Sequence, residues 1–165
     1  INMGCPAKRV TNGWSGSALM RDLDHASRLI EATVAATTRP VTLKMRLGWD
    51  DASLNAPLLA RRAESLGVRL VTVHGRTRCQ FYKGSARWSL VRETVAATRL
   101  PVVVNGDIAS VADAREALRQ SGAAAVMVGR AAVGRPWLVG EIAASLAGRA
   151  WRAPANDAMA EAAAL

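Results

Sequence analysis

Polar or glycine-containing segments recur at the ends of short apolar runs, and their spacing limits the folds that this chain can adopt. The intervals are 30 residues from Lys44 to His74, 31 from His74 to Asn105 and 24 from Asn105 to Gly129. Each interval is about the length of one strand followed by one helix. Such repetition predicts a parallel sheet, built either as an open doubly wound sheet or as a (β/α)8 barrel.

A repeated segment supports the same unit. Residues 34–41 and 95–102 are identical at six of eight aligned positions, at an offset of 61 residues, which is two units. Hydrophobic periodicity predicts strands over 41–46, 70–74, 101–104 and 124–128. A loop is expected over 8–17, and helices are expected to begin near residues 19, 55, 88, 110 and 136. Gly67 and Gly122 are expected to stop two of these helices, and Ser110 with Asp113 resembles a capping box.

Two features favour the barrel over the open sheet. Polar groups occupy the inward-facing alternate positions on strand after strand, and the last two strands end in glycine-containing turns of the kind in which barrels hold phosphate. A barrel normally takes about 250 residues, whereas this chain has 165. We therefore expect the second half of a (β/α)8 TIM barrel, about strands 4 to 8, over residues 1–147. Residues 148–165 are expected to begin a C-terminal helical region or to form a tail, so that the chain is a fragment cut at both ends.

Cys5 follows the first expected strand and lies between Gly4 and Pro6. A lone cysteine is most often a small buried apolar residue. Here the glycine lets another molecule approach the backbone and the proline ends regular pairing, so we expect the thiol to project into the mouth of a site. A thiol is mostly protonated at neutral pH and suits proton donation, and nothing in the sequence indicates a histidine that would make it a nucleophile.

Lys44 and His74 occupy inward-facing alternate positions of two consecutive expected strands. Lys44 is either a solvated strand-end residue or a cation at the base of the site, and we favour the site. There it would hold an anionic cofactor or form a Schiff base. His74 fits a hydrogen-bonded strand-end histidine and a site residue equally well.

The last two strand ends predict a phosphorylated ligand. Their turns lead into helices, so backbone N–H groups can face a phosphate, and an arginine adds a bidentate donor. The residues concerned are Asn105, Gly106, Asp107, Gly129 and Arg130. The loop over 76–84 interleaves cations with two aromatic residues; it is either a solvated loop or a surface that neutralises phosphates and stacks a base.

Composition narrows the classes of partner. The chain has 22 Lys and Arg against 13 Asp and Glu, a formal net charge of +9, and half of its residues are hydrophobic, which excludes a disordered protein. The charge indicates either a polyanionic partner or a solvated basic surface, because no run of five basic residues concentrates it. Cys5 and Cys79 show neither a metal-ligand spacing nor a disulfide framework, so we expect no metal and a reducing cytoplasm, with Cys79 structural or incidental. No apolar run approaches the roughly 18 residues of a membrane span.

With these residues assembled, the chain resembles the bacterial tRNA-dihydrouridine synthases over residues 1 to about 146. Six segments match the family in order and spacing: 1–6, 44–46, 73–78, 104–108, 127–132 and 134–137. The resemblance implies a fragment that lacks the family's N-terminal strands and most of the C-terminal helical domain that holds tRNA, of which 148–165 would be the beginning.

The resemblance implies an FMN-dependent oxidoreductase that reduces the C5=C6 bond of a uridine in tRNA, with NADPH reducing the flavin. Cys5 would protonate uracil C5, Lys44 and His74 would contact FMN, and residues 105–107 and 129–130 would hold its phosphate end. Arg46, Arg76 and Arg78 would lie near the substrate or cofactor. The partner would be tRNA, and the oligomeric state is left open.

Two alternatives remain beside this interpretation. One is another phosphate-binding TIM-barrel enzyme in which Lys44 forms a Schiff base. The other is an inactive partial barrel, which would act only as a folding unit or as a weak RNA-binding surface. Its open parallel edge would be expected to aggregate or self-associate.

Overall fold

The computed structural model describes residues 1–154 of the chain. Most of the expected C-terminal region starting at residue 148, and the whole of the alanine-rich helical stub expected over 158–165, lie outside the described residues.

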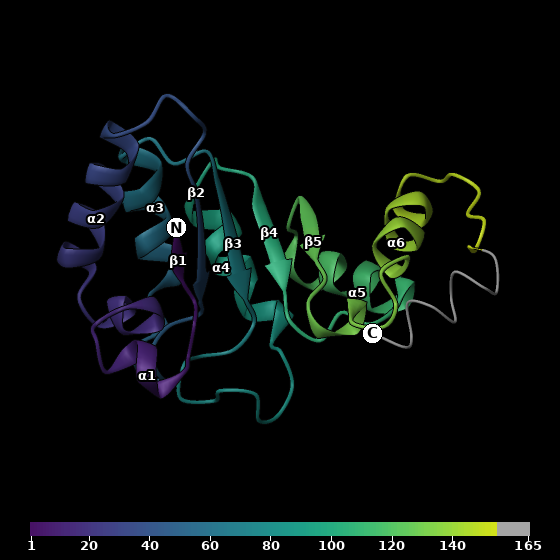
Figure 1. The fold of residues 1–165 in the computed structure, drawn as a ribbon, viewed down its shortest axis with the longest axis horizontal. Helices are drawn as coiled ribbons and strands as arrows, with labels where there is room; N and C mark the ends of the chain where they lie inside the picture. The colour runs from purple at the N-terminus through teal and green to yellow at the C-terminus, as the bar shows by residue number, and fades with distance from the viewer. Residues whose placement is uncertain (155–165) are drawn as a thin grey trace.

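Five parallel strands form one sheet, as the repeat predicted. The strands pair in chain order, β1 to β5, and Figure 1 shows them side by side in that order. Their bounds are β1 Asn2–Met3, β2 Thr42–Arg46, β3 Leu70–His74, β4 Val102–Asn105 and β5 Ala125–Met127. Within the described residues β1 and β5 do not pair with each other, so the sheet is not closed.

Helices connect successive strands. In Figure 1 α2 and α3 flank the β1 end of the sheet, whereas α5 and α6 lie toward the β5 end. The helices are α1 Lys8–Thr11, α2 Leu23–Ala35, α3 Ala56–Ser65, α4 Trp88–Ala97, α5 Val111–Ser121 and α6 Leu138–Leu146, with short 3-10 helices η1 Gly16–Arg21 and η2 Arg130–Ala132. None of the helices over residues 1–154 combines the length and the apolar character that crossing a membrane requires.

The segment between β1 and α2 differs from the sequence-based expectation. The predicted loop over 8–17 contains α1 and the start of η1, and the long helix begins at Leu23 rather than near residue 19. Asp22 sets this start, because its carboxylate accepts a hydrogen bond of 2.9 Å from the N–H of His25. Leu19 is buried as predicted, but it reaches the core from η1.

The predicted helix ends and cap agree with the structure. Gly67 and Gly122 follow α3 and α5 with φ of +93° and +69°, a backbone region that disfavours other residues. Ser110 accepts a hydrogen bond from the N–H of Asp113, whose carboxylate in turn accepts from the Ser110 hydroxyl.

The two faces of the sheet have different chemistry. Met3, Met45, Val73 and Val104 are paired neighbours across four strands, and all four are fully buried in the hydrophobic core that the helices complete. Burying each such side chain stabilises the fold by roughly 1.5–3 kcal/mol. Because side chains alternate along a strand, the residues before and after each of these face the other way. That second face carries the polar groups.

Candidate functional site

A cavity of about 730 Å³ opens at the carboxyl ends of the strands. All five strands or the turns that follow them contribute to its lining. Arg46 and the residues predicted for proton donation and cofactor binding line it: Cys5, Lys44, His74, Asn105, Gly106, Asp107, Gly129 and Arg130. Arg76 and Arg78, also expected near the substrate or cofactor, are not among the lining residues in the described part of the chain. Sequence positions spread over 126 residues therefore meet in one place.

Cys5 lies in the turn after β1, with its backbone held by η1. The carbonyl oxygen of Cys5 accepts hydrogen bonds from the N–H of Ser17 at 3.0 Å and from its hydroxyl at 2.9 Å. Gly16 packs so closely that a Cβ there would lie 2.7 Å from the same oxygen. The turn is thereby fixed, and the half-buried thiol borders the cavity.

Lys44 lies at the floor of the cavity, opposite Asn2 in the strand register. Burial lowers the pKa of the Lys44 ammonium below its ordinary value, and the neighbouring Arg46 guanidinium adds to the effect. A desolvated ammonium of this kind gains more from an anionic partner than a solvated one does. Lys44 is thus suited to hold an anionic group.

His74 is half-buried and lies one strand over from Arg46. Burial lowers the His74 pKa to about 3, and the cations Arg46, Lys44 and Arg76 contribute to the shift. The imidazole is therefore neutral at pH 7. Within the described residues its Nδ1 is buried without a hydrogen-bond partner. A buried ring nitrogen without a partner is uncommon in folded proteins and fits a ligand group.

Arg46 joins two segments next to the cavity. Arg46 is a buried residue, with only 2% of its surface exposed. Its Nε donates to the carbonyl oxygen of Gly4 at 2.9 Å, and its Nη1 donates to those of Thr77 and Phe81 at 2.8 and 2.9 Å. The Cys5 turn and the loop after β3 are joined through Nε and Nη1 of this one guanidinium.

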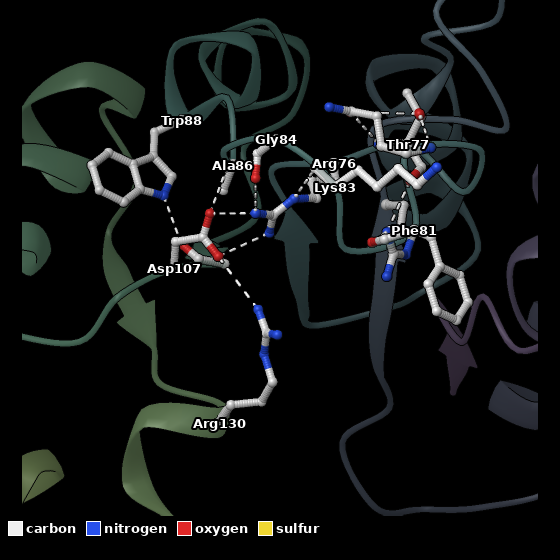
Figure 2. A network of polar contacts seen from close by, with 12 residues as sticks. Arg76, Thr77, Phe81, Lys83, Gly84, Ala86, Trp88, Asp107 and Arg130 are labelled. Carbon is white, nitrogen blue, oxygen red and sulfur yellow. Dashed lines mark hydrogen bonds and ion pairs between the residues drawn. The ribbon is translucent and has the colours of Figure 1, made fainter.

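Asp107 forms the centre of a polar network, which Figure 2 shows. Arg76 donates to both carboxylate oxygens at 2.9 and 2.6 Å, and the N–H of Ala86 donates at 2.8 Å. Partial burial works to raise the pKa of the Asp107 carboxyl, but the hydrogen bonds from Arg76 and Ala86 outweigh it and lower that pKa. The remaining donors of Arg76 reach the carbonyl oxygens of Lys83 and Gly84. The Arg76 guanidinium and the Asp107 carboxylate therefore both hold the loop over 75–87 in place.

The rim of the cavity formed by Gly129 and Arg130 is open. A Cβ built on Gly129 would meet no atom of the described residues within 4 Å, and the neighbouring Arg130 side chain is 69% exposed. The Arg130 guanidinium lies 4.7 Å from the ring centroid of Tyr82 and 3.6 Å from Asp107. Asn105 supports this rim from below, because its Nδ2 donates to the Met127 carbonyl oxygen at 2.8 Å.

A family model matches almost the whole chain. The family is described as dihydrouridine synthase (Dus), and the match covers residues 1–164. The chain belongs to the dihydrouridine synthase family.

Curated members of the family are similar to the chain over most of its length. A probable tRNA-dihydrouridine synthase of Rhodobacter capsulatus is 61% identical over 150 residues, 91% of this chain and 46% of that protein. A probable tRNA-dihydrouridine synthase of Rhizobium leguminosarum is 61% identical over 143 residues, with coverages of 87% and 45%. The tRNA-dihydrouridine synthase B of Xanthomonas axonopodis is 54% identical over 147 residues, with coverages of 89% and 44%. The chain spans about half the length of the curated relatives it matches.

Among the cavity-lining residues that were not predicted as site residues, Asn2 and Tyr82 carry polar side chains. Asn2 shares the polar face with Lys44, and strand alternation is the sequence signal that could have identified it. Tyr82 comes from the basic and aromatic loop over 76–84. Within residues 1–154, no group of three or more His, Cys, Asp or Glu side chains is placed to hold a metal ion.

Proposed function

We propose that the chain carries the FMN-binding half of the catalytic barrel of a tRNA-dihydrouridine synthase. The observation that carries the proposal is the cavity itself. One open pocket borders a thiol, a desolvated lysine, an arginine at a glycine rim and a histidine nitrogen that finds no partner among residues 1–154. Family membership favours FMN binding by Lys44 over formation of a Schiff base.

The sheet supports the finer assignment of the fold as half of a (β/α)8 TIM barrel. Its strands are all parallel in sequential order, and the cavity lies at their carboxyl ends, where barrel enzymes have their sites. We assign residues 1–147 to the catalytic half-barrel. Residues 148–165 would begin the helical region that contacts tRNA.

The cavity suits FMN in size and in chemistry. About 730 Å³ falls within the range of cofactor pockets. Lys44 would bind an anionic part of the flavin, His74 would hydrogen-bond it through Nδ1, and the 105–107 and 129–130 turns with Arg130 would hold the phosphate. Asp107 would act through its backbone, since its carboxylate is committed to Arg76 and Ala86. Bound FMN would supply hydride chemistry, with NADPH as the reductant.

Cys5 would act as the proton donor. Its Sγ would give a proton to C5 of a uracil ring held at the cavity mouth, so that the C5=C6 bond gains one hydride and one proton in total. The tRNA nucleotide would have to leave its stack to reach this depth. Two free cysteines accord with a reducing cytoplasm.

Flavin retention tests the cofactor assignment. The 165-residue chain is mixed with excess FMN and desalted, and its visible absorbance spectrum is recorded. We expect flavin bands near one FMN per chain, and a loss of at least about tenfold in FMN affinity for Lys44→Ala, because one charged contact contributes roughly 1.5–3 kcal/mol. A colourless wild-type protein, or full retention by Lys44→Ala, would contradict the assignment.

The role of Cys5 is tested by Cys5→Ala in the FMN-loaded chain with unmodified tRNA and NADPH. Flavin retention should be unchanged, whereas dihydrouridine formation measured by mass spectrometry should fall by about 10²–10⁴-fold, the usual contribution of a general acid. Cys79→Ala is the matched control, because Cys79 is exposed and does not line the cavity. Equal turnover by Cys5→Ala and Cys79→Ala would rule out the proton-donor role.

A further inference from the structure

Four side chains beside the cavity stack alternately as aromatic ring and guanidinium. The Arg21 guanidinium lies 5.4 Å from the ring centroid of Trp14 and 4.8 Å from that of Trp49. The Arg78 guanidinium lies 4.7 Å from the Trp49 ring. We call Trp14, Arg21, Trp49 and Arg78 the Trp–Arg ladder. Its members come from three separate segments, which follow β1, β2 and β3.

The ladder is fixed to the same backbone that holds Cys5. Trp14 and Arg21 flank Gly16 and Ser17, the residues that pack on and hydrogen-bond the Cys5 carbonyl oxygen. Arg78 is fixed at the other end, since its Nη2 donates to the Thr11 hydroxyl at 3.2 Å and its N–H donates to the Gly48 carbonyl oxygen at 3.0 Å. The ladder lies at the carboxyl end of the sheet, but none of its members lines the cavity. It is therefore a second surface next to the site.

Trp14 ends the ladder on the solvent side. Its side chain is 55% exposed, and its φ of +55° is a backbone conformation that large residues rarely adopt. An exposed indole on unfavourable backbone adds little to core packing. Residues held in this way often have a functional reason.

The cations of the ladder are available to an anionic partner. Over residues 1–154, neither Arg21 nor Arg78 forms an ion pair with a carboxylate. The acidic residues next to the ladder in sequence are already engaged. Asp22 caps α2, Asp50 accepts from Ser53 and Ala52, and Asp51 pairs with Arg87.

We propose that the Trp–Arg ladder binds an unpaired base of the RNA substrate next to the nucleotide that enters the cavity. The base would stack on the outer face of Trp14, and Arg21, the next member of the ladder, would lie near a flanking phosphate. Alternating aromatic and cationic groups fit single-stranded nucleic acid, because every base presents a π-face and every linkage a negative charge. This inference rests on the proposed function for the identity of the RNA. It adds a contact that places the strand beside Cys5.

The test compares affinities for a labelled single-stranded RNA of about 12 nucleotides, a length within the range of single-strand sites. Fluorescence anisotropy is recorded for the full chain, Trp14→Ala and Trp14→Phe. Loss of one stacked base should weaken binding by about tenfold in Trp14→Ala, and Trp14→Phe should recover most of it. Trp151→Ala is the matched control: Trp151 is also partly exposed, but it packs on Gly140 of α6. None of these changes alters the net charge, so general electrostatic binding is constant.

A second probe separates base stacking from charge. An RNA duplex with the same number of phosphates should bind wild type and Trp14→Ala equally, since its bases are already stacked. Equal single-strand affinities for wild type and Trp14→Ala, or no single-strand binding by wild type, would overturn the proposal. An equal loss on the duplex or on an acidic peptide would also overturn it, because the surface would then be a general anion patch.

Flavin retention keeps this test distinct from that of the proposed function. The ladder does not line the cavity, so Trp14→Ala should hold FMN as wild type does. RNA affinity is measured without flavin and without turnover. A Trp14-dependent affinity in a chain that binds no FMN would support the ladder alone, and the reverse pattern would support the cofactor site alone.

Discussion

The surroundings of His74 fix its protonation state. Burial and three neighbouring cations disfavour the imidazolium, so the pKa falls from an ordinary 6.5 to about 3. Between these two values the unfolded chain binds a proton that the folded chain does not. Stability therefore rises with pH over this window and is lost as the pH falls from above 6.5 toward 3.

We predict that His74→Gln removes this pH dependence. From pH 7.5 to pH 5 the wild-type free energy of unfolding should fall by up to about 2 kcal/mol more than that of the variant, from 1.36 kcal/mol per pH unit. Urea unfolding at several pH values measures the difference, and His25 is present in both proteins. If the free energy of unfolding of the two proteins changed with pH in parallel, the pKa of His74 would be the same in the folded and unfolded chain, and the prediction would be wrong.

The site positions could be predicted one by one from the sequence, because strand alternation and glycine turns are local signals. Cys5, Lys44 and His74 all line the cavity as their positions indicated. The partners of the arginines could not be predicted. Arg46 and Arg76 bond to carbonyl oxygens of loops whose path depends on tertiary packing. Sequence shows a cation, but only the fold shows that its donors are already used.

At the scale of elements, η1 controls the turn that carries Cys5. The close approach of Gly16 to the Cys5 carbonyl oxygen leaves no room for a side chain. The sequence did not reveal η1, because Leu19 continues the helical periodicity of α2 across Asp22. Periodicity predicted which side chain is buried. It could not show that a capping carboxylate divides the segment.

Gly16→Ala should disturb this packing. The new Cβ would lie 2.7 Å from the Cys5 oxygen and 2.9 Å from Val10 Cγ1, at a φ of +57°. We expect a loss of about 2–4 kcal/mol in the free energy of unfolding, from the left-handed backbone and the overpacking together. Alkylation of the Cys5 thiol by iodoacetamide should become faster, and that of exposed Cys79 should not change.

Gly134→Ala separates the two causes. Gly134 has a φ of +70°, but no atom in the part of the chain that the structure describes lies within 4 Å of its Cβ position. This control should lose only the backbone contribution of about 1–2 kcal/mol and leave Cys5 alkylation unchanged. An equal loss of unfolding free energy in Gly16→Ala and Gly134→Ala would mean that the Cys5 turn can shift to accommodate the new Cβ at no cost.

For the whole molecule, the segments that follow β5 in the chain carry exposed apolar groups. Val133 follows η2 and is 81% exposed, and Val139 on α6 is about half exposed. The repeat predicted a parallel sheet, and the strands pair in chain order. If the sheet is half of a barrel, as proposed above, further strands would pair with its open edges. The β5 edge is the part of the surface that should attract another apolar surface.

We predict that the chain self-associates through this edge. Val133→Asp should weaken self-association by about tenfold, because burying a valine side chain contributes roughly 1.5 kcal/mol. Sedimentation velocity over a range of protein concentrations measures the change. Leu58→Asp is the matched control, since Leu58 is an exposed apolar residue on α3. A monomer at all concentrations, or the same effect from Leu58→Asp, would contradict the prediction.

Because the two faces of the sheet differ in chemistry, mutations on one face affect the cavity and mutations on the other affect the packing. Met45 and Val73 serve the packing, whereas their chain neighbours Lys44, Arg46 and His74 border the cavity. In evolution, substitution of a cavity residue can therefore change which ligand binds, while the hydrophobic layer on the other side of the sheet stays unchanged. Residues that can change the ligand and residues that preserve the packing thus alternate along the same strands.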